Sequence, residues 1–160
     1  MKRRLYRVIF LLFIASALPA SPGLGTVPDI QDSLREYSSL LGMTLNEAFQ
    51  RFGVPAEVRS VRGDEPWQDD VVFRYEDGLS LFWYRQRVWQ VRFDRRFRGS
   101  FLELAVGASR SAAIELLGEP FYAEADWVLY HFAGDGFPVR LRLFFGESGL
   151  EDAYLYRGDF

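Results

Sequence analysis

A repeated pattern of five residue types is the feature that most constrains the fold of this 160-residue chain. A glycine, a hydroxyl residue, an alanine, a second glycine and a proline recur in the same order, with a single offset of 65 positions. They are Gly42, Thr44, Ala48, Gly53 and Pro55 in the first copy and Gly107, Ser109, Ala113, Gly118 and Pro120 in the second. Five matches in register indicate an internal duplication.

Each copy is predicted to begin with a short helix. Thr44 and Glu47 have the spacing of a capping box, in which the two side chains bind otherwise unpaired N–H groups of the first turn. Ser109 takes the capping position in the second copy, but Ala112 replaces the glutamate, so this cap should be weaker. A glycine followed by a proline ends each helix. A further helix is predicted from Asp29 to Leu41.

Strand signals follow each helix and are separated by turn residues at 77–78 and 134–136. The predicted strands are 57–61, 71–75, 79–84 and 88–93 in the first copy, and 121–123, 127–132, 139–145 and 150–156 in the second. The segment 97–105 links the copies and can add an edge strand. The predicted fold class is α+β, with two tandem repeats. Each repeat is a short helix, or a helix pair, on one face of a three- or four-stranded antiparallel sheet.

The N-terminal segment has the composition of an export signal. Basic residues up to Arg7 precede the apolar run 8–15, which is shorter than the roughly twenty residues that span a bilayer. Ala15-Ser16-Ala17 fits the cleavage rule, and Ala20 is a second option. An uncleaved N-terminal anchor is the alternative. We expect a periplasmic or secreted protein whose mature chain has no transmembrane span. The predicted organisation is a signal peptide at 1–20, a linker at 21–28, an N-terminal helix with the first repeat at 29–98, and the second repeat at 99–160.

The residues available for catalysis or metal binding are few. The chain has no cysteine and one histidine, His131, which excludes disulfides, thiolate metal sites, cysteine nucleophiles and histidine-rich metal sites. It contains no phosphate-binding loop, dinucleotide fingerprint, zinc-protease motif or nucleophile elbow. We therefore expect no enzyme activity, no cofactor and no metal. The minor alternative is an enzyme acting through surface carboxylates such as Asp69-Asp70 or Glu151-Asp152.

Alternation along the predicted strands separates a core face from a face of arginine and aromatic side chains. Trp89, Val91 and Phe93, for example, are expected in the core, opposite Arg92. The candidate partner-binding residues are Arg74, Tyr84, Arg92, Arg140, Arg142, Phe144, Tyr154 and Tyr156. An antiparallel sheet can leave one face to solvent, and arginine and tyrosine are enriched at protein–protein hot spots. The alternative is that arginine–aromatic pairs only stabilise a solvated face.

The first copy also carries a family resemblance. Gly42-Met43-Thr44, Glu47-Ala48 and Phe52-Gly53-x-Pro55, followed by an aromatic strand and an apolar hairpin, resemble the SmpA/OmlA (BamE-like) repeat. They are also similar to the tandem repeat of beta-lactamase inhibitory proteins. The resemblance covers 42–93 and, more weakly, 107–156. It implies helices on one face of an antiparallel sheet and a binding or scaffolding role without catalysis. Two repeats and no lipidation cysteine favour the inhibitor-like architecture over the single-repeat lipoproteins.

Charge patterning suggests a second kind of partner. The segment Arg85–Arg98 contains six arginines and one acidic residue, Asp94, and is a candidate contact for an anionic component of the cell envelope. The alternative is a solvated turn, partly neutralised by acidic residues between 64 and 70. No nucleic-acid partner is expected, because residues 8–160 hold fifteen basic and twenty-two acidic residues, a net charge of −7.

The prediction for function is an exported, non-catalytic protein-binding or scaffold module of the bacterial cell envelope, with a protein partner of unknown identity. The alternative is a secreted or periplasmic inhibitor of an exported enzyme. An inhibitor needs a projecting loop that enters the active site of its target. Trp67 and Phe137, each in a loop between two predicted strands, are the candidate plugs.

Overall fold

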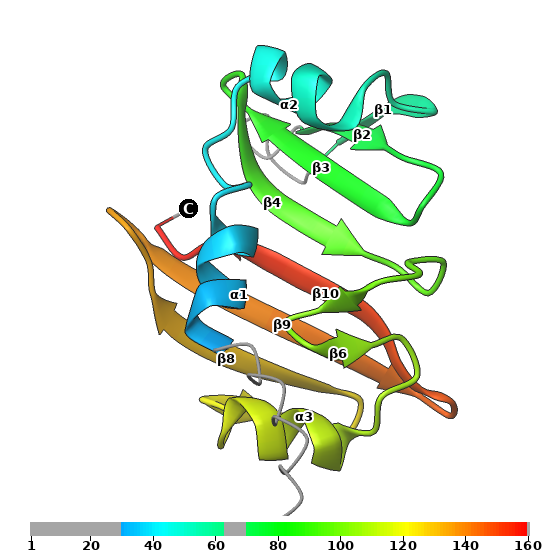
Figure 1. Ribbon diagram of the computed structural model, residues 1–160, viewed down its shortest axis with the longest axis vertical. Helices are drawn as coiled ribbons and strands as arrows, with labels where there is room; N and C mark the ends of the chain where they lie inside the picture. Colours follow the sequence, from blue (N-terminus) through cyan, green and yellow to red (C-terminus); the bar gives the residue numbers. More distant parts are fainter. Residues whose placement is uncertain (1–29, 63–69, 160) are drawn as a thin grey trace, which may run out of the picture.

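The computed structural model describes residues 30–62 and 70–159, which form an α+β fold (Figure 1). The helices are α1 (Ile30–Ser38), α2 (Leu45–Phe52) and α3 (Arg110–Leu117). The strands are β1 (Glu57–Val61), β2 (Asp70–Arg74), β3 (Leu79–Tyr84), β4 (Arg87–Phe93), β5 (Ser100–Phe101), β6 (Leu104–Ala105), β7 (Tyr122–Ala123), β8 (Trp127–Ala133), β9 (Pro138–Gly146) and β10 (Gly149–Arg157). Among these described residues, no helix is long and apolar enough to cross a bilayer.

Eight of the strands form one antiparallel sheet in the order β1-β2-β3-β4-β10-β9-β8-β7. Strands β1 to β4 form one meander and β7 to β10 form another. The two meanders meet where β4 pairs antiparallel with β10. The last strand of each meander therefore lies at the centre of the sheet, and the first strand of each lies at an edge. Figure 1 shows all three helices on the same face of this sheet.

The entry into α2 and the entry into α3 make the same backbone contacts. Gly42-Met43 exchanges two hydrogen bonds with Val88 of β4, at 2.7 and 3.1 Å. Gly107-Ala108 exchanges two hydrogen bonds with Leu150 of β10, both at 2.8 Å. Both glycines have a φ near +86°, in the region that L-amino acids avoid. Each helix is therefore joined to the central strand of its own half.

The helix caps agree with the sequence. The Thr44 hydroxyl accepts a hydrogen bond from the Glu47 N–H at 3.3 Å, and the Thr44 N–H donates to the Glu47 carboxylate at 2.7 Å. This completes the predicted capping box. The Ser109 hydroxyl accepts one hydrogen bond from the first turn of α3, at 3.1 Å, with no reciprocal carboxylate. Gly53 and Gly118, with φ of +73° and +83°, end the two helices as expected.

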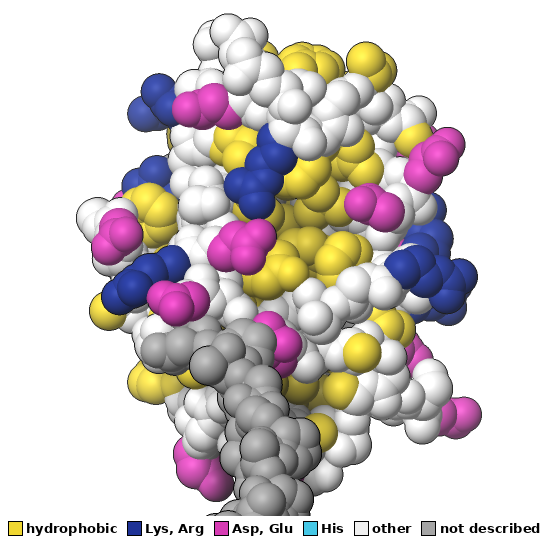
Figure 2. Space-filling view, in the orientation of Figure 1, with side chains coloured by type: hydrophobic (Ala, Val, Ile, Leu, Met, Phe, Trp, Pro, Cys, Tyr) yellow, Lys and Arg dark blue, Asp and Glu magenta, His cyan; other side chains and the backbone are white. Residues whose placement is uncertain are grey.

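The core lies between the sheet and the helices. One row of buried cross-strand partners runs through Phe73, Leu81, Val91, Leu155, Leu141 and Tyr130. The helix α2 covers one end of the sheet, with the Phe52 ring 5.5 Å from the ring of Tyr75. The helix α1 covers the middle, with Tyr37 5.5 Å from Phe93. Figure 2 shows this face, where hydrophobic side chains fill the gaps between the helices and charged side chains surround them.

A β-bulge in β4 places Trp89 on the opposite face of the sheet from the one predicted. The pairing of β4 with β3 shifts between Phe82 and Trp83, so Trp89 is an extra residue in the strand. The bulge turns Val88 into the core, where it is fully buried. Trp89 is half-buried on the opposite face, where its indole N–H donates to the Asp70 carboxylate at 3.1 Å. The expected position of Trp89 in the core is therefore wrong.

Two further segments differ from the prediction. The helix α1 ends at Ser38 rather than Leu41, and its predicted first residue lies outside the described residues. The segment 97–105 adds no edge strand to the large sheet but forms the separate hairpin of β5 and β6. This hairpin covers the core, because the Phe101 ring stacks 4.6 Å from the ring of Phe93. The Tyr37 hydroxyl of α1 donates to the Ser100 carbonyl at 2.7 Å, and this hydrogen bond connects α1 to the hairpin.

Candidate functional site

The sheet face turned away from the helices, the open face, is built from two long rows of side chains. The first row crosses all eight strands through Glu57, Arg74, Ser80, Arg92, Tyr154, Arg142, Leu129 and Tyr122. The second row runs through Arg59, Val72, Phe82, Gln90, Tyr156, Arg140 and His131. A short third row contains Asp152, Phe144 and Trp127. Because no helix of the described chain covers this side, the rows form a broad surface.

The eight predicted binding residues all lie on the open face, and all are half-buried. Six of them are neighbours at its centre, on β4, β10 and β9: Arg92, Arg140, Arg142, Phe144, Tyr154 and Tyr156. The other two lie apart in the first meander, Arg74 on β2 and Tyr84 at the end of β3. The predicted set is therefore one central group with two outlying members.

Aromatic rings lie beside two of the three central arginines, Arg142 and Arg92. The Arg142 guanidinium lies 4.7 Å from the centre of the Trp127 ring and 6.0 Å from that of Tyr156. The Arg92 guanidinium lies 5.5 Å from the centre of the Tyr154 ring. A cation above an aromatic face is attracted by the ring quadrupole. Trp127 was not among the predicted binding residues. Alternation along β8 places it on the same side as Leu129 and His131, which pair with Arg142 and Arg140 of the open face.

The two predicted binding arginines of the first meander, Arg74 and Arg92, are ion-paired with acidic neighbours. Arg74 forms an ion pair with Glu57 at 3.3 Å. Arg92 forms one with Asp152 of β10 at 2.7 Å, and both side chains are less than one-third exposed. Burial raises the pKa of Asp152 above its ordinary value, although the Arg92 charge opposes this shift. The Arg92–Asp152 pair also joins the two meanders side chain to side chain.

The two arginines of β9 have no such compensation. Within the described residues, neither Arg140 nor Arg142 forms an ion pair with a carboxylate. The buried Nε of Arg142 has no hydrogen-bond partner, and its terminal nitrogen is 3.5 Å from the Tyr156 hydroxyl. Positive charge is therefore concentrated over β9, among aromatic rings.

A charged cavity of about 400 Å³ lies at one end of the open face. Its lining residues are Arg74, Arg92, Asp94, Arg95, Arg96, Glu151 and Asp152. Asp94 is buried and accepts hydrogen bonds from the Arg96 side chain, the shortest at 2.7 Å. Burial raises the pKa of Asp94, but the hydrogen bonds and charge of Arg96 outweigh it and hold this pKa below its ordinary value. The acidic residues therefore neutralise most of the arginines of this cavity.

The basic segment Arg85–Arg98 does not form a single patch. Its first members, Arg85 and Arg87, precede or begin β4, and its last three arginines follow the strand. A strand of this length separates its ends by roughly 20 Å. Arg87 donates to the Gly42 carbonyl at 3.0 Å, and Arg92 and Arg96 are ion-paired. The Arg85 guanidinium lies 5.1 Å from the centre of the Tyr84 ring, so four of the six arginines in the segment contact other groups of the chain.

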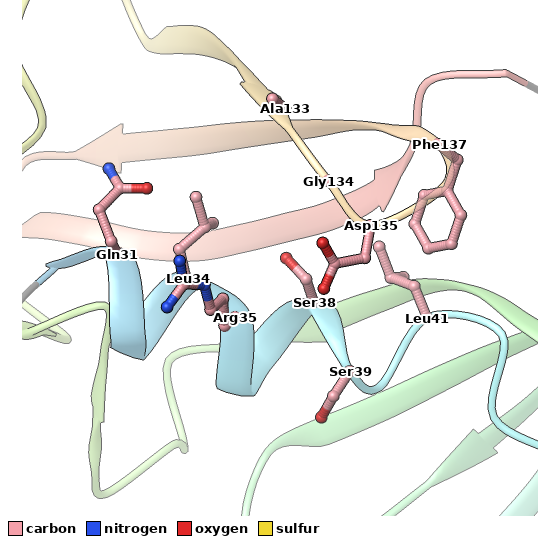
Figure 3. Close-up of a pocket in the computed structure, with 10 residues that line it drawn as sticks. All are labelled: Gln31, Leu34, Arg35, Ser38, Ser39, Leu41, Ala133, Gly134, Asp135 and Phe137. Carbon is pink, nitrogen blue, oxygen red and sulfur yellow. The ribbon is translucent and has the colours of Figure 1, made fainter.

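The two candidate plug residues lie elsewhere. Trp67 is outside the described residues. Phe137, in the turn between β8 and β9, packs against the core, and the Arg157 guanidinium lies 4.3 Å from the centre of its ring. It lines a second cavity of about 400 Å³ between this turn and α1, where Figure 3 shows Phe137, Asp135 and Ser38. Phe137 is therefore on the helix side of the sheet, remote from the open face.

His131, Asp70 and Asp152 have structural contacts, and Asp69 lies outside the described residues. His131 is exposed on β8 and stacks on Phe121, with ring centres 4.0 Å apart. Asp152 holds Arg92, and Asp70 accepts the Trp89 indole N–H. In the part of the chain that the structure describes, no cluster of three metal-ligating side chains occurs.

In comparisons with known proteins, no family model, no curated protein and no solved structure matches the chain.

Proposed function

We propose that this chain is a non-catalytic protein-binding module of the bacterial cell envelope, and that it binds its partner through the open face. One observation carries the proposal. Within the described residues Arg140 and Arg142 form no ion pair with a carboxylate, and the Arg142 guanidinium lies over the rings of Trp127 and Tyr156 on the open face. Arginine and aromatic side chains of this kind dominate the binding energy of protein interfaces.

The partner surface should present carboxylates beside apolar or aromatic groups. A carboxylate from the partner would meet the half-buried guanidinium groups of Arg140 and Arg142 on β9. A charge-assisted, bidentate pair with arginine is stronger than a hydrogen bond between neutral groups. The rings of Trp127, Tyr154 and Tyr156 would contact the apolar part of the same surface.

We also propose that the two meanders are copies of one duplicated unit. The offset of 65 residues, the cap at the start of each helix and the paired hydrogen bonds of Gly42-Met43 and Gly107-Ala108 support it. The same features support the resemblance to the SmpA/OmlA repeat and to the two-repeat inhibitors. An inhibitor role would follow if the partner is an exported enzyme and the open face covers its active site.

Location in the envelope rests on the predicted signal peptide, which lies outside the described residues. N-terminal sequencing of the protein from the periplasm or medium tests it. A new N-terminus after Ala17 or Ala20 is the expected result. An intact Met1 in a membrane fraction would instead show an uncleaved anchor.

A crosslinking capture from the native envelope fraction tests the binding proposal. The bait is the full chain, compared with Arg140→Glu/Arg142→Glu and with a matched control, Arg35→Glu/Arg51→Glu. The control makes the same change in charge on α1 and α2, on the other face of the sheet. We expect one partner to be captured by the wild type and the control, and lost with the open-face variant.

Purified partner and stability measurements complete this test. Binding should weaken as salt rises, because charge attraction contributes to it. The open-face variant should lose no more than about 1 kcal/mol of stability per arginine, since Arg142 loses only partly exposed cation–π contacts and neither arginine is ion-paired within the described residues. Equal capture by the open-face variant, or loss of capture by the control, would refute the role of the open face.

A further inference from the structure

The strand β1 leaves one edge of the large sheet open. It pairs only with β2, so its outer row of N–H and C=O groups has no strand beside it among the described residues. Four of its five residues are exposed. The opposite edge strand, β7, is only two residues long. Short edge strands protect a sheet against pairing with another chain, whereas a longer exposed strand is a template for it.

Apolar side chains surround this open edge on the helix side of the sheet. Val58 of β1 is 57% exposed, and Phe49 of α2 and Val71 of β2 are 43% and 42% exposed. Val54, in the link from α2 to β1, is 84% exposed. Apolar side chains gathered at a surface mark a site of association, because burying them removes apolar area from water.

We propose that two copies of this chain associate edge to edge through β1 to form a dimer with one continuous antiparallel sheet. The two-fold axis passes beside Val58. This register places Val58 opposite Val58 of the second copy and Glu57 opposite Arg59 of the second copy. In a sheet, paired residues share a face, so the valines meet on the helix side and the charges meet on the open face.

Within one copy Glu57 forms ion pairs with Arg59 and with Arg74. Across the dimer the charges of Glu57 and Arg59 remain complementary, and this selects the register over its neighbours. Centred on Val58, the pairing forms two Glu–Arg cross-strand pairs, each of which is favourable. Centred on Glu57 or on Arg59, it places two like charges directly opposite each other. The copies also carry their open faces on the same side of the dimer, so a partner with two sites would bind both at once.

Disulfide trapping tests the register, because the chain has no cysteine of its own. In either type of antiparallel pair, facing Cα atoms are about 4.5–5.5 Å apart, which a disulfide can bridge. Val58→Cys should therefore form a disulfide-linked dimer under mild oxidation. Ser60→Cys is the matched control on the same side of β1, where the two copies of residue 60 would be roughly 14 Å apart along the strands.

Sedimentation of the full chain measures the association itself. The wild type should form a dimer as concentration rises, and Glu57→Arg or Arg59→Glu alone should weaken it about tenfold. The double variant Glu57→Arg/Arg59→Glu restores opposite charges across the dimer and should regain most of the affinity, while it loses the ion pair with Arg74 just as Glu57→Arg alone does. A wild type that stays monomeric at every concentration, a double variant as weak as the singles, or equal trapping of both cysteine variants would overturn the proposal. Circular dichroism of each variant verifies that it is folded.

Discussion

At the scale of single residues, the open face contains two kinds of arginine. Arg74 forms an ion pair with Glu57, and Arg92 forms one with Asp152, so their positive charges are neutralised within the fold. Within the described residues, the two arginines of β9 form no ion pair with a carboxylate, and in the proposed complex their charge would face the partner. The distinction matters because replacing an ion-paired arginine removes both the packing of its side chain and the ion pair, and so destabilises the fold.

Two aspartates of this face should respond to pH in opposite directions. The folded-state pKa of Asp94 is below its ordinary value, so the unfolded state binds the proton more tightly and stability rises with pH. Its contribution is complete above the unfolded pKa of about 3.9 and is lost as the pH falls through the folded value. The folded-state pKa of Asp152 is raised, so the folded state binds the proton more tightly and stability falls as the pH rises through this range.

Urea unfolding of the wild type, Asp94→Asn and Asp152→Asn between about pH 3 and pH 7 measures both effects. The stability advantage of the wild type over Asp94→Asn should grow with pH. Its advantage over Asp152→Asn should shrink with pH. The same slope for both variants would contradict the opposite pKa shifts.

The residue identities on the open face followed from strand alternation, but the pairs did not. Arg92 and Asp152 are 60 positions apart in the sequence, and nothing in either neighbourhood indicates the other. The position of Trp89 also depends on a distant group, since Asp70 of another strand accepts its N–H. Such contacts appear only when strands from different parts of the chain meet.

At the scale of elements, local chemistry determined most boundaries. The turns at Asp77-Gly78 and 134–136 stop the strands, and the hydroxyl caps start α2 and α3, so these elements were predictable to within a residue or two. The bulge in β4 and the hairpin of β5 and β6 were not. Both depend on packing against the core rather than on the residues nearby, as the contact of Phe101 with Phe93 shows.

The two caps should differ in strength. Thr44→Ala removes the hydroxyl that accepts from the Glu47 N–H and donates to the Glu47 carboxylate, and should cost about 1–2 kcal/mol of unfolding free energy. Ser109→Ala removes a hydroxyl with no such carboxylate partner and should cost about 0.5–1 kcal/mol. Thr44→Ser keeps the hydroxyl and should remain close to the wild type. Chemical denaturation of the three variants measures the order. A larger loss for Ser109→Ala would contradict the capping-box argument.

At the scale of the whole molecule, β4 and β10 make the two meanders one sheet. Four residue pairs join these strands, and the side chains of Val91 and Leu155 are fully buried beside each other. The helix α1 adds a second connection, because Ser33 donates to Glu103 at 3.1 Å and the helix also borders the turn between β8 and β9. The halves should therefore unfold together.

Truncating a side chain at this seam tests that expectation. Leu155→Ala should cost about 3 kcal/mol, because the cavity lies where both halves pack. Hydrogen exchange should show lower protection in both β2–β3 and β8–β9. The control Val61→Ala, at an exposed position of β1, should change stability by less than about 0.5 kcal/mol. Loss of protection confined to β8–β9 would show that the halves unfold separately.

The central position of β10 has a consequence for biosynthesis. Translation adds roughly 5–20 residues per second, and domains usually begin to fold as they emerge from the ribosome. In this chain β4 pairs with β3 on one side and with β10 on the other. The second pairing cannot form until residues 149–157 have been synthesised. Until then β4 is itself an open edge, rich in aromatic and aliphatic side chains. We therefore expect the nascent chain to be most prone to pairing with other chains before residues 149–157 join the sheet.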